Sequence, residues 1–349
     1  MAEGFAPEPP HRRRARYRGK NPRHFSEKYK EHAPERYGDT IAKVLASGKT
    51  PAGSHRPIMV SEILELLAPQ PGEIAVDCTL GYGAHAEEIL ARILPGGHLI
   101  GLDVDPLELP RSETRLRSLG FGPEAFTAVR TNFAGIAQAL AGRRADIILA
   151  DLGVSSMQLD DPVRGFSLKE DGPLDMRMNP RRGEPAGALL EKLGMDALAR
   201  LLVENSDETN ALQLAAALTG RKFTGTTALT AAIRAAVPRL RETEQELAVR
   251  RVFQALRIAV NDEFSTLETF LHRLPFCLGS GGRVAILSFH SGEDRRVKKA
   301  FEAGCRANIF AEISSEVVRP TLAERHANPR STSAKLRWAR LITAEPKPH

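Results

Sequence analysis

The sequence predicts an α/β fold in which a mostly parallel sheet carries an inserted all-helical domain. Three observations lead to this prediction. Short apolar runs at 74–76 and 147–150 each end in an acidic residue, as buried parallel strands do when they enter a loop. Helical periodicity follows the first run, which is typical of alternating strands and helices. Between 161 and 245 the strand pattern stops, and Leu and Ala recur at spacings of three and four.

Composition restricts the possible classes of protein. The chain has 349 residues, and 42% of them are hydrophobic, which is enough for a proper core in one large domain or two. We expect no transmembrane helix, because no apolar run reaches about 18 residues. The polar N-terminus is not a secretory signal. Cys78, Cys277 and Cys305 are too few and too far apart for a disulfide framework or a zinc site. A cytoplasmic protein without a metal is expected.

The net charge of +6 lies in the N-terminal extension. Residues 1–50 hold 12 Lys and Arg against 6 Asp and Glu, and the remaining residues hold 37 of each. We assign residues 1–54 to a basic, flexible extension. It is either a solvated tail or an arm for RNA phosphates in which Tyr17 stacks on a base, and the two interpretations are compatible.

The first apolar run leads into a candidate ligand loop. After Asp77 the chain reaches Gly81-x-Gly83, and residues 86–94 have helical periodicity. A strand, a glycine turn and a helix together point backbone N–H groups at a ligand. The next strand ends in Asp103, 22 residues after Gly81, and this spacing suits a carboxylate that accepts both ribose hydroxyls of a nucleoside.

This pattern fits NAD as well as S-adenosylmethionine. A dinucleotide fingerprint needs a small third residue so that the pyrophosphate can sit on the helix, and Ala86 permits this. His85, however, is bulky at a point where the pyrophosphate needs close backbone approach. S-adenosylmethionine has no phosphate, so the loop favours a methyltransferase over an NAD-dependent oxidoreductase.

The most distinctive segment is the charged loop at 151–178. A loop of this length inside a compact domain is usually functional. Open α/β sheets also place their chemistry at the carboxyl ends of strands. The loop reads DLGVSS-x-QLDD-x-x-RGFS and then DGPLDMRM. On these residues the chain resembles the bacterial 16S rRNA (cytosine-N(4))-methyltransferase family, and the resemblance extends from about residue 55 to about residue 341.

The resemblance implies a Rossmann-like class I methyltransferase sheet whose last strand is antiparallel. It implies S-adenosylmethionine as cofactor and a decoding-site cytidine of 16S rRNA as substrate, within a small ribosomal subunit particle. No membrane is involved, and a homodimer is an option that the sequence leaves open. We expect the methyltransferase core at 55–160 and 246–349, with the helical insertion at 161–245 as a cap on the RNA side.

The resemblance also implies a set of cofactor-binding residues. They are Gly83, Ala84, His85, Asp103, Phe133, Asp151 and Gln158. The family has Gly-Gly-His where this chain has Gly83-Ala84-His85, which affects how closely the loop approaches the methionine moiety. Phe133 taken alone is equally well explained as a core residue.

Four residues are candidates for the reaction itself. Asp151 closes a strand, and we assign it to orienting the cofactor or the amine. Asp175, Arg177 and His290 are candidates for holding the cytidine and its phosphate. A lone histidine at a strand end, as in Ser288-Phe289-His290, is more often a hydrogen-bonded structural residue.

Some features favour a different class, a non-catalytic RNA-binding or ribosome-assembly factor that keeps the fold. These are the basic extension, Ala84 and the stretch Ser206-Asp207-Glu208-Thr209, where the family has Gly-Glu-Glu with a basic residue. Retention of Asp103, Asp151 and Gln158 argues against this alternative.

Further arginines are candidate RNA contacts or solvated surface. Arg250, Arg251 and Arg257 have helical spacing. Arg330 lies in a turn that matches the family.

Overall fold

The structure is a computed structural model, and it describes residues 57–168 and 170–343. The basic extension at 1–54 lies outside the described residues, and so does its predicted role as an RNA-binding arm. Within the described ranges, no helix has both the length and the apolar character that crossing a membrane requires.

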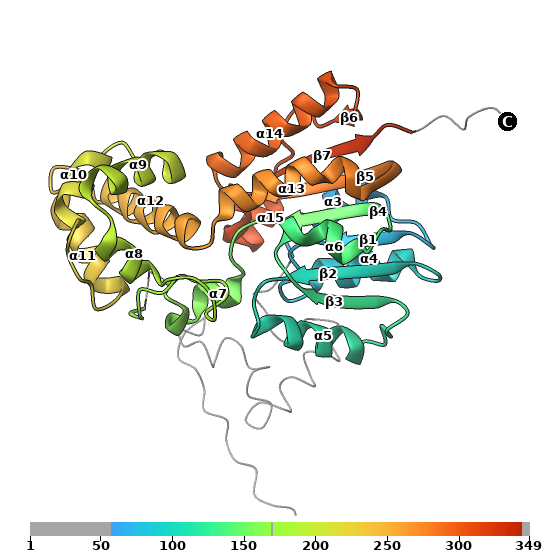
Figure 1. The fold of residues 1–349 in the computed structure, drawn as a ribbon, viewed down its shortest axis with the longest axis horizontal. Coiled ribbons are helices and arrows are strands. Elements are labelled where there is room, and N and C mark those ends of the chain that lie inside the picture. Colours follow the sequence, from blue (N-terminus) through green and yellow to red (C-terminus); the bar gives the residue numbers. More distant parts are fainter. Residues whose placement is uncertain (1–56, 169, 344–349) are drawn as a thin grey trace, which may run out of the picture. The chain divides into compact units, whose positions relative to one another are not determined.

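The described part of the chain forms one seven-stranded sheet (Figure 1), in the order β3-β2-β1-β4-β5-β7-β6. The strands are β1 (Ile74–Asp77), β2 (His98–Asp103), β3 (Phe126–Arg130), β4 (Ala145–Asp151), β5 (Leu278–Ser288), β6 (Phe310–Ile313) and β7 (Lys335–Leu341). The pairs among β1 to β5 are parallel, whereas β7 runs antiparallel to both of its neighbours. The predicted mostly parallel sheet with an antiparallel last strand is therefore confirmed.

The register of the parallel strands determines where the site lies. Asp77 pairs with Gly101 of β2 and with Leu149 of β4. Consequently the acids that end these strands, Asp77, Asp103 and Asp151, come to one edge of the sheet. The interior residues of β1, β2 and β4 are buried, as expected for parallel strands covered on both faces.

Helices cover both faces of the sheet. One face packs against α3 (Val60–Leu67), α4 (Ala84–Ile93) and α5 (Glu108–Ser118), through a cluster that includes Leu67, Leu90 and Leu116. The other face packs against α6 (Ile136–Leu140), α13 (Glu263–Cys277) and α14 (Ser291–Arg306), through a cluster that includes Phe270 and Phe301. Each helix turns one apolar stripe toward the sheet, and the result is a three-layer α/β core.

A second group of helices has a hydrophobic core of its own. It comprises α8 (Ala186–Lys192), α9 (Met195–Ser206), α10 (Ala211–Leu218), α11 (Thr226–Ala236) and α12 (Glu242–Val260). Figure 1 shows these helices gathered beside the sheet, in olive to orange. Because α12 contributes Val252, Phe253 and Leu256 to this core, we propose that the insertion extends to Val260, past the expected boundary at 245.

Short elements complete the fold. Between β4 and the insertion lie α7 (Ser156–Asp160) and the 3-10 turn η3 (Pro162–Arg164). The turn η2 (Phe133–Gly135) follows β3, and α15 (Leu322–Ala327) with η4 (Pro329–Ser333) precedes β7.

Candidate active site

The glycine loop after β1 uses its N–H groups within the protein, since Gly81 donates to Asp103 and Gly83 donates to the carbonyl oxygen of Leu80, and it leads into the start of α4. Gly81 and Gly83 have φ values of 48° and 80°, in the left-handed region that glycine adopts without strain. Gly83 is the N-cap residue of α4, and no side chain caps this helix. The first-turn N–H groups and the positive end of the helix dipole are therefore suited to an anionic group of a ligand.

Asp103, at the end of β2, is held from two sides. Its Oδ2 accepts the N–H of Gly81 at 2.8 Å, and its Oδ1 accepts the N–H of Asp105 at 2.8 Å. Burial raises the pKa of Asp103 to about 6, although these two hydrogen bonds oppose the rise. The geometry brings the predicted ribose acceptor and the glycine loop together.

Asp151 lies beside His85 at the same edge. Nδ1 of His85 is 3.8 Å from Oδ2 of Asp151. His85 Nε2 is 2.9 Å from the carbonyl oxygen of Ile58, and because a carbonyl only accepts, Nε2 carries the hydrogen. Burial, and then the charge of Glu293, raise the pKa of Asp151 to about 7. Its side chain is still 28% exposed, so a ligand can reach the carboxylate.

Asp77 is a third carboxyl group at this edge. It is 2% exposed, and burial raises its pKa to about 6, while the charge of His85 opposes the rise. With three carboxyl groups close together, the edge is suited to a cationic ligand centre.

The side chains of Gln158 and Phe133 both contact other residues of the protein. Gln158 forms a reciprocal capping box with Ser155 at the start of α7, and its Nε2 donates to Asp105 at 2.8 Å. Phe133 is partly buried against the core, with its ring in an edge-to-face contact with Phe270 at 5.4 Å between centroids. These contacts fix where the two side chains lie relative to the edge.

Asp175 and Arg177 pair with each other. Arg177 Nε and Nη2 donate to the two Asp175 carboxylate oxygens at 2.8 and 2.7 Å. Burial works to raise the pKa of Asp175, but the bonds from Arg177 outweigh it and hold this pKa below its ordinary value. Asp175 is therefore an anion at neutral pH. About one fifth of each side chain is exposed, so a ligand can reach the pair.

His290 is the N-cap of α14. Its Nδ1 accepts the N–H of Glu293, and its Nε2 lies 3.3 Å from Glu293 Oε1. Burial works to raise the pKa of Glu293, but His290 helps to hold it below its ordinary value, and the charge of Glu293 in turn contributes to the raised pKa of Asp151. The side-chain atoms of Glu263, His290 and Glu293 that could coordinate a metal ion all lie within 4.8 Å of one another. Both oxygens of Glu263 already accept from Arg257, each at 2.8 Å, and this ion pair balances its charge.

Two of the arginines considered as RNA contacts, Arg257 and Arg330, are ion-paired within the protein. Arg330 Nη2 lies 2.7 Å from Asp160 Oδ1. Asp207, in the stretch that departs from the family pattern, accepts two bonds from Arg295 and one from the hydroxyl of Ser291. Its role in this structure is thus to fasten the end of α9 to α14. Among the helical arginines, Arg250 is exposed.

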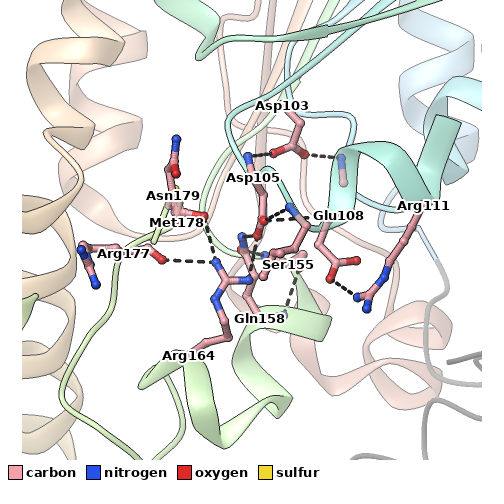
Figure 2. Close-up of polar contacts among 12 residues, drawn as sticks. Asp103, Asp105, Glu108, Arg111, Ser155, Gln158, Arg164, Arg177, Met178 and Asn179 are labelled. Carbon is pink, nitrogen blue, oxygen red and sulfur yellow. Dashed lines mark hydrogen bonds and ion pairs between the residues drawn. The ribbon is translucent and has the colours of Figure 1, made fainter. Parts of the chain in front are cut away.

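A polar network next to Asp103 was missed by the sequence analysis (Figure 2). Asp105 accepts from Arg164 and Gln158, and Arg164 reaches the carbonyl oxygens of Arg177 and Met178. Asn261 also holds this segment, because it accepts from the N–H of Met178 and donates to the carbonyl of Met176. The sequence signal for Arg164 was its place in the RGFS motif. That motif does not indicate, however, that the arginine side chain is buried.

The strand order, the single antiparallel strand β7, the glycine loop after β1 and the acid that ends β2 define a class I methyltransferase fold. Within this class the chain belongs to the MraW methylase family, whose model matches residues 52–342. This membership is incompatible with the NAD-dependent oxidoreductase considered as an alternative.

Similar proteins carry consistent names. The chain is 49% identical over 343 residues to "Ribosomal RNA small subunit methyltransferase H 1" of Lachnoclostridium phytofermentans, covering 95% of this chain and 93% of that one. It is also 49% identical over 337 residues to "Ribosomal RNA small subunit methyltransferase H 2" of Alkaliphilus metalliredigens, covering 94% and 97%. A solved rRNA methylase from Streptococcus thermophilus matches with a TM-score of 0.39 at 11% identity, covering 81% of this chain and 94% of that one.

Proposed function

We propose that this protein transfers a methyl group from S-adenosylmethionine to the exocyclic 4-amino group of a decoding-site cytidine in 16S rRNA. The single observation that carries this proposal is the near full-length identity of 49% to small-subunit rRNA methyltransferases. The acidic edge and the charged loop supply residues suited to that reaction.

S-adenosylmethionine fits the residues that are present. The fixed carboxylate of Asp103 is suited to the ribose hydroxyls, and the uncapped start of α4 at Gly83–His85 is suited to the carboxylate of the methionine moiety. Phe133 lies beside β3, where it can border the adenine. When bound, the cofactor supplies a methyl group on a cationic sulfonium. The carboxylate of Asp151 favours that positive charge.

The acceptor amine is a weak nucleophile, because its lone pair is delocalised into the cytosine ring. The protein must therefore orient the amine toward the methyl group, and positioning can contribute roughly 7–11 kcal/mol. As the nitrogen–carbon bond forms and the sulfur–carbon bond breaks, the amine loses a proton. We assign Asp151 as its acceptor, since a carboxylate with a pKa of about 7 can take a proton near neutral pH.

The substrate segment and the helical insertion complete the proposal. Asp175 and Arg177 are candidates for holding the cytidine and its phosphate. A cytidine in folded RNA must be splayed out to enter such a site, and an adjoining cap would help to hold it. We therefore propose a small ribosomal subunit particle in the cytoplasm as the substrate.

Mass spectrometry of small-subunit rRNA nucleosides, from cells with and without this gene, tests the proposal. We expect N(4)-methylated cytidine to disappear on deletion and to return with the wild-type gene but not with Asp151→Ala. Unchanged methylation after deletion would mean that a paralogue carries the reaction, or that this protein binds RNA without methylating it. Titration with S-adenosylhomocysteine separates the two, because a chain that no longer binds cofactor gives no heat.

A further inference from the structure

A buried ion pair joins the cofactor edge to the segment that carries Asp175 and Arg177. Asp105 and Arg164 are 1% and 7% exposed, and Nη1 of Arg164 lies 2.8 Å from Oδ2 of Asp105 (Figure 2). Charges buried this deeply are costly unless additional hydrogen bonds complete them. Here the additional bonds go to two different parts of the site.

On the cofactor side, Asp105 is one hydrogen bond away from the predicted ribose acceptor. Its backbone N–H donates to Asp103 Oδ1, while the other carboxylate oxygen of Asp103 accepts from Gly81. The Asp105 side chain also accepts the N–H of Leu107 at the start of α5. Any displacement of Asp105 is therefore transmitted to Asp103.

On the substrate side, Arg164 makes three bonds to consecutive residues. Nη2 donates to the carbonyl oxygens of Arg177 at 3.2 Å and Met178 at 2.8 Å, and the Arg164 carbonyl accepts the N–H of Met176 at 3.1 Å. Met176 has a φ of 61°, a left-handed conformation that is costly for a residue with a Cβ. Such a conformation persists only where surrounding contacts impose it. Arg164 provides several of those contacts.

We propose that Arg164 is a positioning residue that links cofactor binding at Asp103 to the ordering of residues 175–178. This inference rests on the proposed function. The bonds run from the glycine loop through Asp103, Asp105 and Arg164 to the backbone that presents Arg177. A ligand that fixes Asp103 therefore favours the ordered substrate segment, and by linkage the ordered segment favours the ligand.

Arginine is required for this role because of its geometry. A planar guanidinium with five N–H donors can bond to a carboxylate and to two carbonyl groups at once, whereas a lysine ammonium is a single point charge. Arg164→Lys therefore keeps a positive charge near Asp105 and loses the fork. Arg111 provides a matched control, since it pairs with Glu108 at 2.8 Å in the same β2–α5 region but its side chain is 56% exposed.

Hydrogen exchange with and without S-adenosylhomocysteine, together with methylation of small subunits that lack the modification, tests this link. In the wild type we expect the ligand to slow exchange at both Gly81 and residues 175–178. In Arg164→Lys we expect a dissociation constant for S-adenosylhomocysteine within threefold of the wild-type value, and the ligand should still slow exchange at Gly81. Exchange at 175–178 should no longer respond to the ligand, and kcat should fall at least tenfold. Arg111→Lys should behave as the wild type.

Two results would overturn the link. One is a wild-type protein that binds S-adenosylhomocysteine without any change in exchange at 175–178, and this result does not depend on how well a variant folds. The other is Arg164→Lys with kcat within twofold of Arg111→Lys. Absence of binding to the wild type would overturn the proposed function itself, and the titration distinguishes that failure from the other two.

Discussion

The two sides of the candidate site are held by different means. At the acidic edge, Asp103 is fixed by backbone N–H groups, and Asp151 ends a strand that is paired on both sides. Residues 162–178 lie outside the sheet, and within them the backbone of 176–178 is held by side-chain hydrogen bonds from Arg164 and Asn261. Substitutions next to Asp103 and Asp151 should therefore leave the acidic edge in place. By contrast, a single substitution at Arg164 or Asn261 can displace the backbone of residues 176–178.

The largest effect is expected at the edge, from Asp151→Asn. The amide cannot accept the proton, so kcat should fall by about 10²–10⁴-fold, the range typical of general bases. This loss corresponds to about 3–5 kcal/mol of transition-state stabilisation. Because the backbone holds the edge and the amide removes a carboxylate that destabilises the fold at neutral pH, thermal unfolding at pH 7 should occur at or above the wild-type temperature. Single-turnover methylation measures the rate, and a rate within threefold of wild type would remove Asp151 from the reaction.

In the segment, Gly165→Ala should reduce stability more than a comparable glycine replacement elsewhere. Gly165 has a φ of 75°, and a Cβ there would lie 2.2 Å from the carbonyl oxygen of Pro173 and 2.7 Å from the nitrogen of Asp175. We expect a loss of about 3 kcal/mol from the overlap and the left-handed conformation together. Gly142→Ala is the control, because its φ is 86° and its Cβ would meet nothing within 4 Å. Urea unfolding that gave equal losses would contradict the crowding argument.

A smaller effect is expected from Asn261→Ala. This change removes the acceptor for the Met178 N–H and the donor to the Met176 carbonyl. The cost of leaving these groups without their partner should be about 2 kcal/mol. Asn205→Ala, which loses one bond to the carbonyl of Ala255 in the insertion, is the control. We expect weaker RNA binding only for Asn261→Ala, measured by filter binding to small subunits.

The most gradual effects concern pH, and they act at the edge. Since the pKa of Asp151 is raised to about 7, the fraction that can accept a proton falls as pH is lowered through 7, and kcat should fall with it. Stability should change in the opposite sense. The folded state holds this proton more tightly than the unfolded chain, so between about pH 4 and pH 7 stability decreases as pH rises. Asp151→Asn should reduce the slope of thermal stability against pH. An unchanged slope would mean that Asp77 and Asp103 cause the pH dependence.

Predictability differs between the two sides for a physical reason. The glycine loop and Asp103 could be predicted, because strand periodicity and a turn are local signals. The burial of Arg164 could not, since it depends on Asp105, which is 59 residues away in sequence. The helical spacing of Arg250, Arg251 and Arg257 was recognised, but spacing does not reveal which surface a helix packs against. The role of His290 as a helix cap agrees with the structural interpretation that the sequence had favoured.

The insertion leaves the sheet after Asp151 and returns at Glu263, whose carboxylate lies near His290 and Glu293. Both connections of the helical group therefore meet at the reacting edge. Asp207 adds a third attachment, since it is bonded to Ser291 and Arg295 of α14. The helical group is thus anchored to the core close to the groups proposed to react, and a substitution that shifts it should alter catalysis as well as RNA binding.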